Sequence, residues 1–204
     1  MPPELIDAIR YGHLLSVGLG LGAACVADLH VVQFLRRPIS RHLLAHLKLC
    51  HRMVWAGLVG MWVTGLMLVY VRTGFVLDSI TPKLWTKLGI VSVLTINAYL
   101  IGRVALPQFR QGIGRAPLEL PMRVKLFGGM LSSLSMASWL LALALGTSKV
   151  LAASGWQIFA LVVPLTYASF GLGALCVALV MHRFGKPYFD APAPAPKWPG
   201  KLVS

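Results

Sequence analysis

The sequence contains little charge and very little acid. Only 12% of its 204 residues are charged, and Asp and Glu together number six against 19 Lys and Arg. A soluble domain carries about 25% charged residues, whereas here 57% of the residues are hydrophobic and the mean hydropathy is +0.74. The composition therefore excludes an ordinary globular enzyme and indicates a membrane protein.

Several motifs that carry chemistry in soluble proteins are also missing. The three cysteines, Cys25, Cys50 and Cys176, have spacings that match neither a CxxC pair nor a zinc finger. The chain has no glycine-rich phosphate loop after a strand, no Ser/His/Asp arrangement and no obvious pair of carboxylates. These absences exclude a disulfide framework and give no support to a hydrolase or a kinase.

Five apolar runs dominate the chain instead. Each has roughly 20 residues or more, which is enough to cross a hydrocarbon core of about 30 Å. They predict an all-α, polytopic membrane protein with a single domain, residues 1–189, that forms a bundle of five transmembrane helices. The expected spans are residues 11–35, 51–71, 83–106, 122–146 and 156–182. Residues 190–204 are rich in proline and are expected to form a disordered cytoplasmic tail.

The basic residues predict how the bundle is oriented. Of the 19 Lys and Arg, 14 lie in or beside the segments that follow the first, third and fifth spans. Under the positive-inside rule these segments face the cytoplasm, so the N-terminus lies outside and the C-terminus lies in the cytoplasm. We expect a multi-pass protein of a bacterial cytoplasmic membrane. Its net charge of +13 is then explained by basic residues in the cytoplasmic loops, and we expect no nucleic-acid partner.

Small residues predict how the helices pack. Gly18 and Gly22 form a GxxxG motif in the first span, and the fourth and fifth spans carry further glycines and serines. In lipid, small residues let helix backbones approach closely. These faces are expected to hold the bundle together, and they offer a surface for a homo-oligomer or for a partner in a membrane complex.

Asp28, in the inner half of the first span, is a candidate because a charged group at the centre of a bilayer costs roughly 3 kcal/mol. Two interpretations are open. Asp28 forms a structural ion pair with Arg52 or Arg103, both of which extend into the membrane from the same side, or it is a site that takes up and releases protons. We favour the ion pair, because both arginines can reach inward along their apolar stems.

His13, near the outer end of the first span, and Lys87, one turn inside the third span, are expected at similar depths. One interpretation is that both are interfacial and that Lys87 extends its amine to the headgroups. The other is that His13 ligates a metal or a heme iron, with Lys87 as a second ligand or as a charge that binds a carboxylate.

A second group of histidines lies on the cytoplasmic side. His42, His46 and Cys50 recur at every fourth position along one face of a helix. If the chain forms a hairpin near Pro38, His30 and His46 lie level with each other. These residues then predict a copper or zinc site, or a heme held between the first two spans. The same basic helix is equally suited to anionic lipid headgroups.

Three short motifs resemble those of a known family. Tyr11-Gly-His13, Cys50-His-Arg52 and Trp85-Thr-Lys87 are similar to motifs of the HemJ-type protoporphyrinogen oxidases and of their looser relatives, the CopD-like small membrane proteins. The resemblance covers the first three spans. It implies a small helical bundle that binds heme b and oxidises protoporphyrinogen. In that family's terms His13 is an axial heme ligand, Lys87 a partner at the same site, and Arg52 a contact for a propionate or a substrate carboxylate.

The chain departs from the HemJ pattern at one place. The Asn-Glu-Pro stretch expected near the start of the fourth span is replaced by Leu118-Glu-Leu-Pro-Met. The resemblance therefore supports a HemJ-like or CopD-like bundle more than it supports the oxidase reaction.

The leading hypothesis is a membrane redox protein that binds heme b or a porphyrin, an oxidoreductase if it is an enzyme, with an electron-transfer partner. The residues expected to hold the cofactor are His13, Lys87, His30 and Arg52. The alternative is a protein that handles a copper or zinc cation or a small solute. The residues expected to hold the metal are His42, His46, Cys50 and His30. A third hypothesis is a non-catalytic accessory subunit of a membrane complex.

Overall fold

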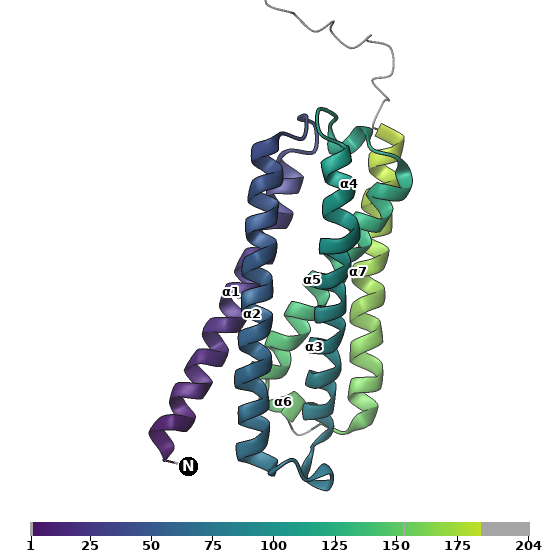
Figure 1. Ribbon diagram of the computed structural model, residues 1–204. Helices are drawn as coiled ribbons and strands as arrows, with labels where there is room; N and C mark the ends of the chain where they lie inside the picture. Colours follow the sequence, from purple (N-terminus) through teal and green to yellow (C-terminus); the bar gives the residue numbers. More distant parts are fainter. Residues whose placement is uncertain (1, 153, 185–204) are drawn as a thin grey trace, which may run out of the picture.

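The protein is a bundle of long helices (Figure 1). The computed structural model describes residues 2–152 and 154–184, and within these ranges it contains helices, turns and loops but no strand. Five of the helical segments are long and apolar enough to cross a membrane. The prediction of an all-α bundle with five transmembrane helices is therefore confirmed. The predicted tail, residues 190–204, lies outside the described residues.

The helices run up and down the bundle, so that α1 begins at one end and α7 finishes at the other (Figure 1). The long helices are α1 (Pro3–Gln33), α2 (Arg41–Thr73), α3 (Pro82–Leu100), α5 (Met122–Thr147) and α7 (Trp156–Phe184). Helix α3 continues through a π-helix, η2 (Ile101–Ala105), into α4 (Leu106–Gln111). The short elements are the 3-10 helices η1 (Leu77–Ser79) and η3 (Pro117–Glu119) and the helix α6 (Lys149–Ala152).

Two helices begin earlier than the apolar runs predict. Helix α1 starts at Pro3 rather than near Tyr11, and α2 starts at Arg41 rather than near His51. The residues in front of each run are more polar, yet they add turns to the same helix because a helix need not end where the hydrocarbon ends. Ser40 fixes the start of α2, since its side chain accepts a hydrogen bond of 3.0 Å from a backbone N–H three residues on.

The third span does not end before Pro107, contrary to the prediction. Helix α3 passes into η2 and then into α4, which holds Pro107 in its first turn. Pro107 has no N–H to donate to the preceding turn, and it lies just beyond the π-helix, where the regular α-helical hydrogen-bond pattern is already interrupted. The span is one continuous segment, Pro82–Gln111. Its π-helical part is of a kind often found at functional sites.

Helices α1 and α2 are the most extensively packed pair in the bundle. At their closest approach Gly57 of α2 lies against the backbone of α1. A Cβ atom added at Gly57 would lie 2.7 Å from the carbonyl oxygen of Ser16 and 2.8 Å from the backbone nitrogen of Gly20. The two backbones can meet here because Gly57 has no side chain.

The predicted GxxxG motif is not the packing motif of α1. A Cβ atom added at Gly18 or Gly22 would meet nothing within 4 Å, and both glycines are exposed. The buried glycine is Gly20, which is covered by the indole ring of Trp139 from α5. Positions two apart lie on nearly opposite faces of a helix, so the face with the GxxxG pattern points away from the bundle.

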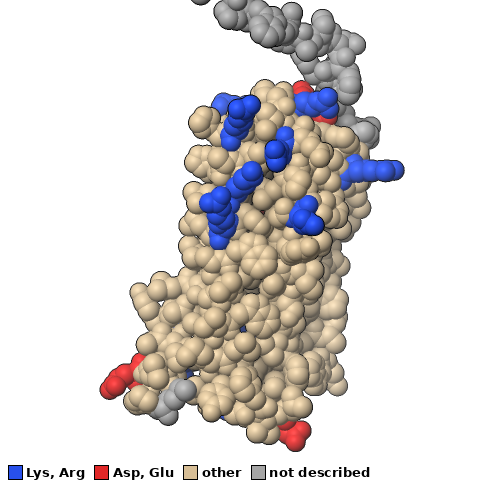
Figure 2. All heavy atoms as spheres, in the orientation of Figure 1, with Lys and Arg blue, Asp and Glu red and all other residues tan. Residues whose placement is uncertain are grey.

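Charge is unevenly distributed along the bundle (Figure 2). On the face shown, most Lys and Arg side chains gather in the upper part, where the α1–α2 loop, the α4–α5 loop and the end of α7 lie. We call this the basic end, and we call the opposite end, with the start of α1 and the α2–α3 loop, the far end. The two loops at the basic end are joined: Ile39 donates to the carbonyl of Arg115 at 2.9 Å and accepts from Gly114 at 3.0 Å.

Gly57→Val is expected to lower the free energy of unfolding by about 1–3 kcal/mol, because the added methyl groups would press on backbone atoms of α1 that cannot rotate away. Gly22→Val is the matched control, since nothing lies within 4 Å of its Cβ position, and its effect should stay within about 0.5 kcal/mol. Unfolding of the detergent-purified protein, followed by circular dichroism, measures both. Equal stability of the two variants would contradict the contact between the α1 and α2 backbones.

Candidate functional site

His13 of α1 forms a hydrogen bond with Thr64 of α2 in the half of the bundle nearer the far end. The His13 Nδ1 and Thr64 Oγ1 atoms are 2.9 Å apart, and the Thr64 hydroxyl donates to the carbonyl of Gly60 at 2.6 Å. A hydroxyl has one proton, and Thr64 uses it on Gly60, so its oxygen accepts from His13. Nδ1 therefore carries a proton, and among the described residues no hydrogen-bond partner is found for Nε2.

Two glycines, Gly12 and Gly65, lie next to this pair. A Cβ atom added at Gly12 would lie 3.6 Å from the Thr64 methyl group, and one added at Gly65 would lie 3.4 Å from Cε1 of His13. Both partners of the hydrogen bond are partly buried. Larger residues at Gly65 would push the imidazole out of position, so the local sequence supports one orientation of the ring.

One cation, Lys87, lies near His13, and two more lie near Lys87. Lys87 of α3 is partly buried and lies within electrostatic range of His13, and Lys83 and Arg72 lie within range of Lys87. The two residues, which the sequence places at similar depths, thus lie within electrostatic range of each other. In the described ranges the one salt bridge is between two side chains near the start of α1, so none of the three cations is paired with an acid. Unpaired amines and guanidinium groups bind carboxylates well.

We call His13, Thr64, Lys87, Lys83 and Arg72 the His13 group. Arg52, which the family resemblance associates with His13 and Lys87, is not part of it. Arg52 lies on α2 more than three turns before Thr64, about 18 Å along the helix axis, and its side chain is exposed. The three residues that carry the resemblance therefore do not form a single site in this structure.

His30 of α1 and His46 of α2 lie side by side at the basic end, as predicted. Their ring centroids are 5.9 Å apart and their planes differ by 17°. His30 Nδ1 lies 2.8 Å from the carbonyl oxygen of Val26. Since a carbonyl only accepts, Nδ1 donates and the lone pair of His30 Nε2 is free. The pair offers ligand atoms, but two nitrogens do not complete a tetrahedral zinc site.

The structure does not bring together the four residues predicted to hold a metal. His42 and His46 are exposed, whereas Cys50 is buried and lines a cavity inside the bundle. Among residues 2–152 and 154–184 there is no group of three or more His, Cys, Asp or Glu side chains that could hold a metal ion. Over eight residues a helical position drifts by about 80°, which turns Cys50 inward and away from His42.

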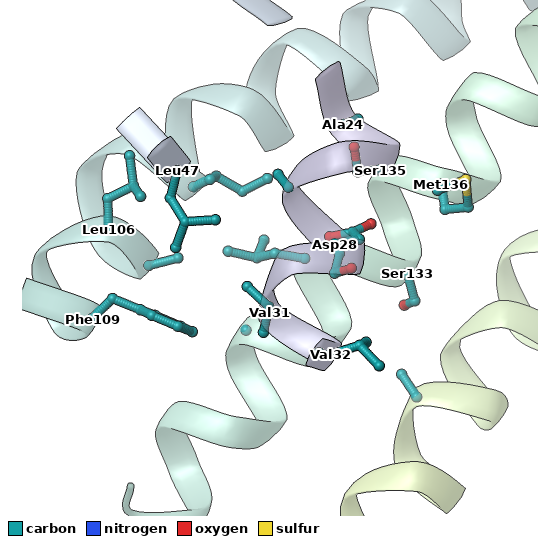
Figure 3. A pocket seen from close by; sticks show the side chains of 18 of the residues that line it. Ala24, Asp28, Val31, Val32, Leu47, Leu106, Phe109, Ser133, Ser135 and Met136 are labelled. Atoms are coloured by element: carbon teal, nitrogen blue, oxygen red, sulfur yellow. The ribbon is translucent and has the colours of Figure 1, made fainter. Parts of the chain in front are cut away.

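A cavity of about 450 Å³ lies within the half of the bundle nearer the basic end (Figure 3). Its wall consists mostly of aliphatic side chains from α1, α2, α5 and α7 and from the segment η2–α4. Figure 3 shows Asp28 pointing from α1 towards α5, the helix that carries Ser133 and Ser135. The other polar residues in the wall are Cys50, His51, Lys125 and Ser132. The volume falls in the usual range of ligand pockets, about 300–1,000 Å³.

Asp28 does not form the ion pair that we favoured from the sequence. Arg52 and Arg103 are both exposed, and in the part of the chain that the structure describes neither forms a salt bridge with Asp28. The carboxyl group interacts instead with the hydroxyl of Ser132 on α5. The prediction was wrong because both arginines lie on the outward faces of their helices, which the sequence position alone does not reveal.

His51 is a candidate that no motif in the sequence indicates on its own. It lines the cavity, and its Nε2 atom lies 3.1 Å from the indole nitrogen of Trp55. An indole N–H only donates, so Nε2 accepts and Nδ1 carries the proton. The ring also packs onto the π-helix, where a Cβ atom added at Gly102 would lie 2.6 Å from Nε2. Two features of the sequence could have indicated His51: its i, i+4 spacing from Trp55, and the glycine Gly102 in the third span.

Comparisons with known proteins add no assignment. No protein-family model matches the chain, and no curated protein or solved structure is significantly similar to it. The likeness to the HemJ-type proteins thus rests on three short motifs, and the interpretation of the site rests on the geometry of its own residues.

Asp28→Leu is expected to leave the free energy of unfolding unchanged or to increase it by about 1 kcal/mol or more, because a carboxyl group without an ion pair is costly in an apolar wall. Asp7→Leu, which removes an exposed salt bridge with Arg10, is the control and should change stability by less than about 1 kcal/mol. Unfolding of the purified variants in detergent measures the effect. A loss of about 3–5 kcal/mol in Asp28→Leu would instead reveal a structural ion pair.

Proposed function

We propose that this chain is a multi-pass membrane redox protein that binds heme b or a related porphyrin through His13. The observation that carries the proposal is the hydrogen-bond chain from His13 to Thr64 to Gly60, which engages Nδ1 and leaves Nε2 available for a ligand. Histidines that ligate metals almost always donate their other N–H to a neighbouring acceptor, which fixes the tautomer and the direction of the ring. Thr64 is such an acceptor.

The cations of the His13 group suit the acidic part of the same cofactor. A heme carries two propionate carboxylates, and Lys87, Lys83 and Arg72 lie close together without an acidic partner among the described residues. In this proposal His13 ligates the iron, Thr64 orients His13, and Lys87 binds a propionate. The heme, when bound, supplies one-electron chemistry, while the chain supplies binding and orientation.

The proposal includes an orientation and a location. By the positive-inside rule the basic end (Figure 2) faces the cytoplasm, so the N-terminus lies outside and the C-terminus inside a bacterial cytoplasmic membrane. The His13 group then lies in the outer half of the bilayer. An electron-transfer partner or an acidic substrate would reach it from that side.

The His30–His46 pair supports a second candidate function, the handling of a copper or zinc cation. The two rings lie within 5.9 Å of each other, and His30 has a free Nε2 lone pair. They belong to the basic end, so in the proposed orientation they meet cations from the cytoplasm. Water or a partner would have to supply the remaining ligands.

The detergent-purified protein is expected to show a Soret band, either as isolated or after addition of hemin. His13→Ala should abolish the band, and Thr64→Val should weaken hemin binding by about 10–100-fold because the imidazole loses the acceptor that orients it. His42→Ala is the matched control, since His42 is exposed and lies outside the His13 group. Absorbance spectra of the oxidised and reduced protein, with hemin titrations, measure these effects.

Two results would contradict the proposal. One is a folded wild type that shows no Soret band and takes up no hemin. The other is a band that survives His13→Ala and is lost in His30→Ala or His46→Ala. Stoichiometric copper or zinc in the wild type that is lost in those two variants would favour the second candidate function.

A further inference from the structure

The cavity near the basic end opens towards the lipid. Its wall includes Val32 of α1 and Val177 of α7, which are 62% and 58% exposed. Both valines belong to apolar spans, so their exposed surface faces hydrocarbon. Helix α1 packs mainly on α2, and α7 packs mainly on α5. The wall between α1 and α7 is therefore the least closed side, and a molecule dissolved in the bilayer can reach the cavity there.

The wall determines what charge a ligand can carry. The lining is mainly aliphatic, and its charged residues are one acid, Asp28, and one base, Lys125, whose amine donates to the carbonyl of Leu118 at 2.9 Å. A carboxyl group in apolar surroundings disfavours an anionic ligand. The basic residues of the same end, within a chain of net charge +13, disfavour a lipophilic cation. An uncharged molecule with an apolar body suits both conditions.

Two polar groups of opposite hydrogen-bonding character lie at nearly the same depth in the wall. Two contacts between α1 and α2, His13 with Thr64 and His30 with His46, define the register of these helices. In that register Asp28 and His51 differ by about 3 Å in their height along the bundle axis. Asp28 can accept a hydrogen bond from a ligand. His51 can donate one from Nδ1, because its Nε2 already accepts from Trp55.

We propose that this cavity binds the head of a lipid-soluble quinone or quinol. Such a head is an uncharged, rigid apolar ring with one oxygen at each of two opposite positions. A quinol hydroxyl would donate to Asp28, and the other oxygen would accept from Nδ1 of His51. The apolar tail would leave the bundle between α1 and α7. The site shares no residue with the His13 group, so this inference does not rest on the proposed function.

Glycines on α5 provide a test that leaves the polar residues intact. Gly128 lines the cavity, and a Cβ atom added there meets nothing within 4 Å, so the side chain of Gly128→Leu would occupy the cavity. Gly146→Leu is the matched control, because Gly146 lies on the same helix, also has nothing within 4 Å and is exposed outside the cavity. Decylubiquinone is the probe, and its binding to the purified full chain is followed by quenching of tryptophan fluorescence.

The wild type and Gly146→Leu are expected to bind the quinone saturably and equally. Gly128→Leu should abolish binding, and Asp28→Ala should weaken binding of the reduced, quinol form by at least about 10-fold, the loss of a charge-assisted hydrogen bond. Asp28→Asn keeps an acceptor and should bind with intermediate affinity. Melting temperatures of all variants confirm that each is folded.

The proposal is overturned if the folded wild type does not bind the quinone saturably, or if folded Gly128→Leu and Asp28→Ala bind it as the wild type does. Preference for tetraphenylphosphonium over the quinone would also overturn it, since the site would then select a lipophilic cation. His13→Ala is expected to retain quinone binding. A protein that binds no quinone would therefore not contradict the heme proposal, and a protein that binds no heme would not contradict the quinone proposal.

Discussion

The backbone contact between α1 and α2 determines where every candidate group lies. Because Gly57 has no side chain, it meets the α1 backbone at Ser16 and Gly20, and this contact supports the observed register of the two helices. That register places His13 beside Thr64 and, many turns away, His30 beside His46. In a bilayer each helix satisfies its own backbone bonds and stays rigid. A shift of one residue would turn a helix by about 100° and separate these pairs.

The same register gives the two halves of the bundle different chemistry. Towards the far end it produces an imidazole whose Nδ1 is engaged by Thr64, with Lys87 nearby and two further cations beside Lys87, none of them paired with an acid among the described residues. Towards the basic end it produces an apolar cavity that contains Asp28 and His51. The first arrangement suits a porphyrin with acidic side chains, and the second suits an uncharged molecule from the lipid.

The sequence was sufficient for features that depend on position along the chain. Bilayer thickness sets the length of an apolar run, so the five spans were predictable, and depth follows from position, so His13 could be associated with Lys87. Features that depend on the rotation of a helix were not predictable. The glycine pattern did not reveal that Gly20 is the buried one, and the position of Asp28 did not reveal that nearby arginines point outward. His51 could not be recognised as a candidate from the sequence, because the residue it packs against, Gly102 of the π-helix, becomes its neighbour only in the folded bundle.

The tautomer of His13 is the most direct test of this account, because it follows from the register of α1 and α2 and carries the proposed function. Nitrogen-15 NMR of the purified protein, labelled at histidine, measures it, with the signal assigned by its loss in His13→Gln. The account predicts a neutral ring with a protonated Nδ1 and an unprotonated Nε2. A proton on Nε2, in either the opposite tautomer or an imidazolium, would contradict it.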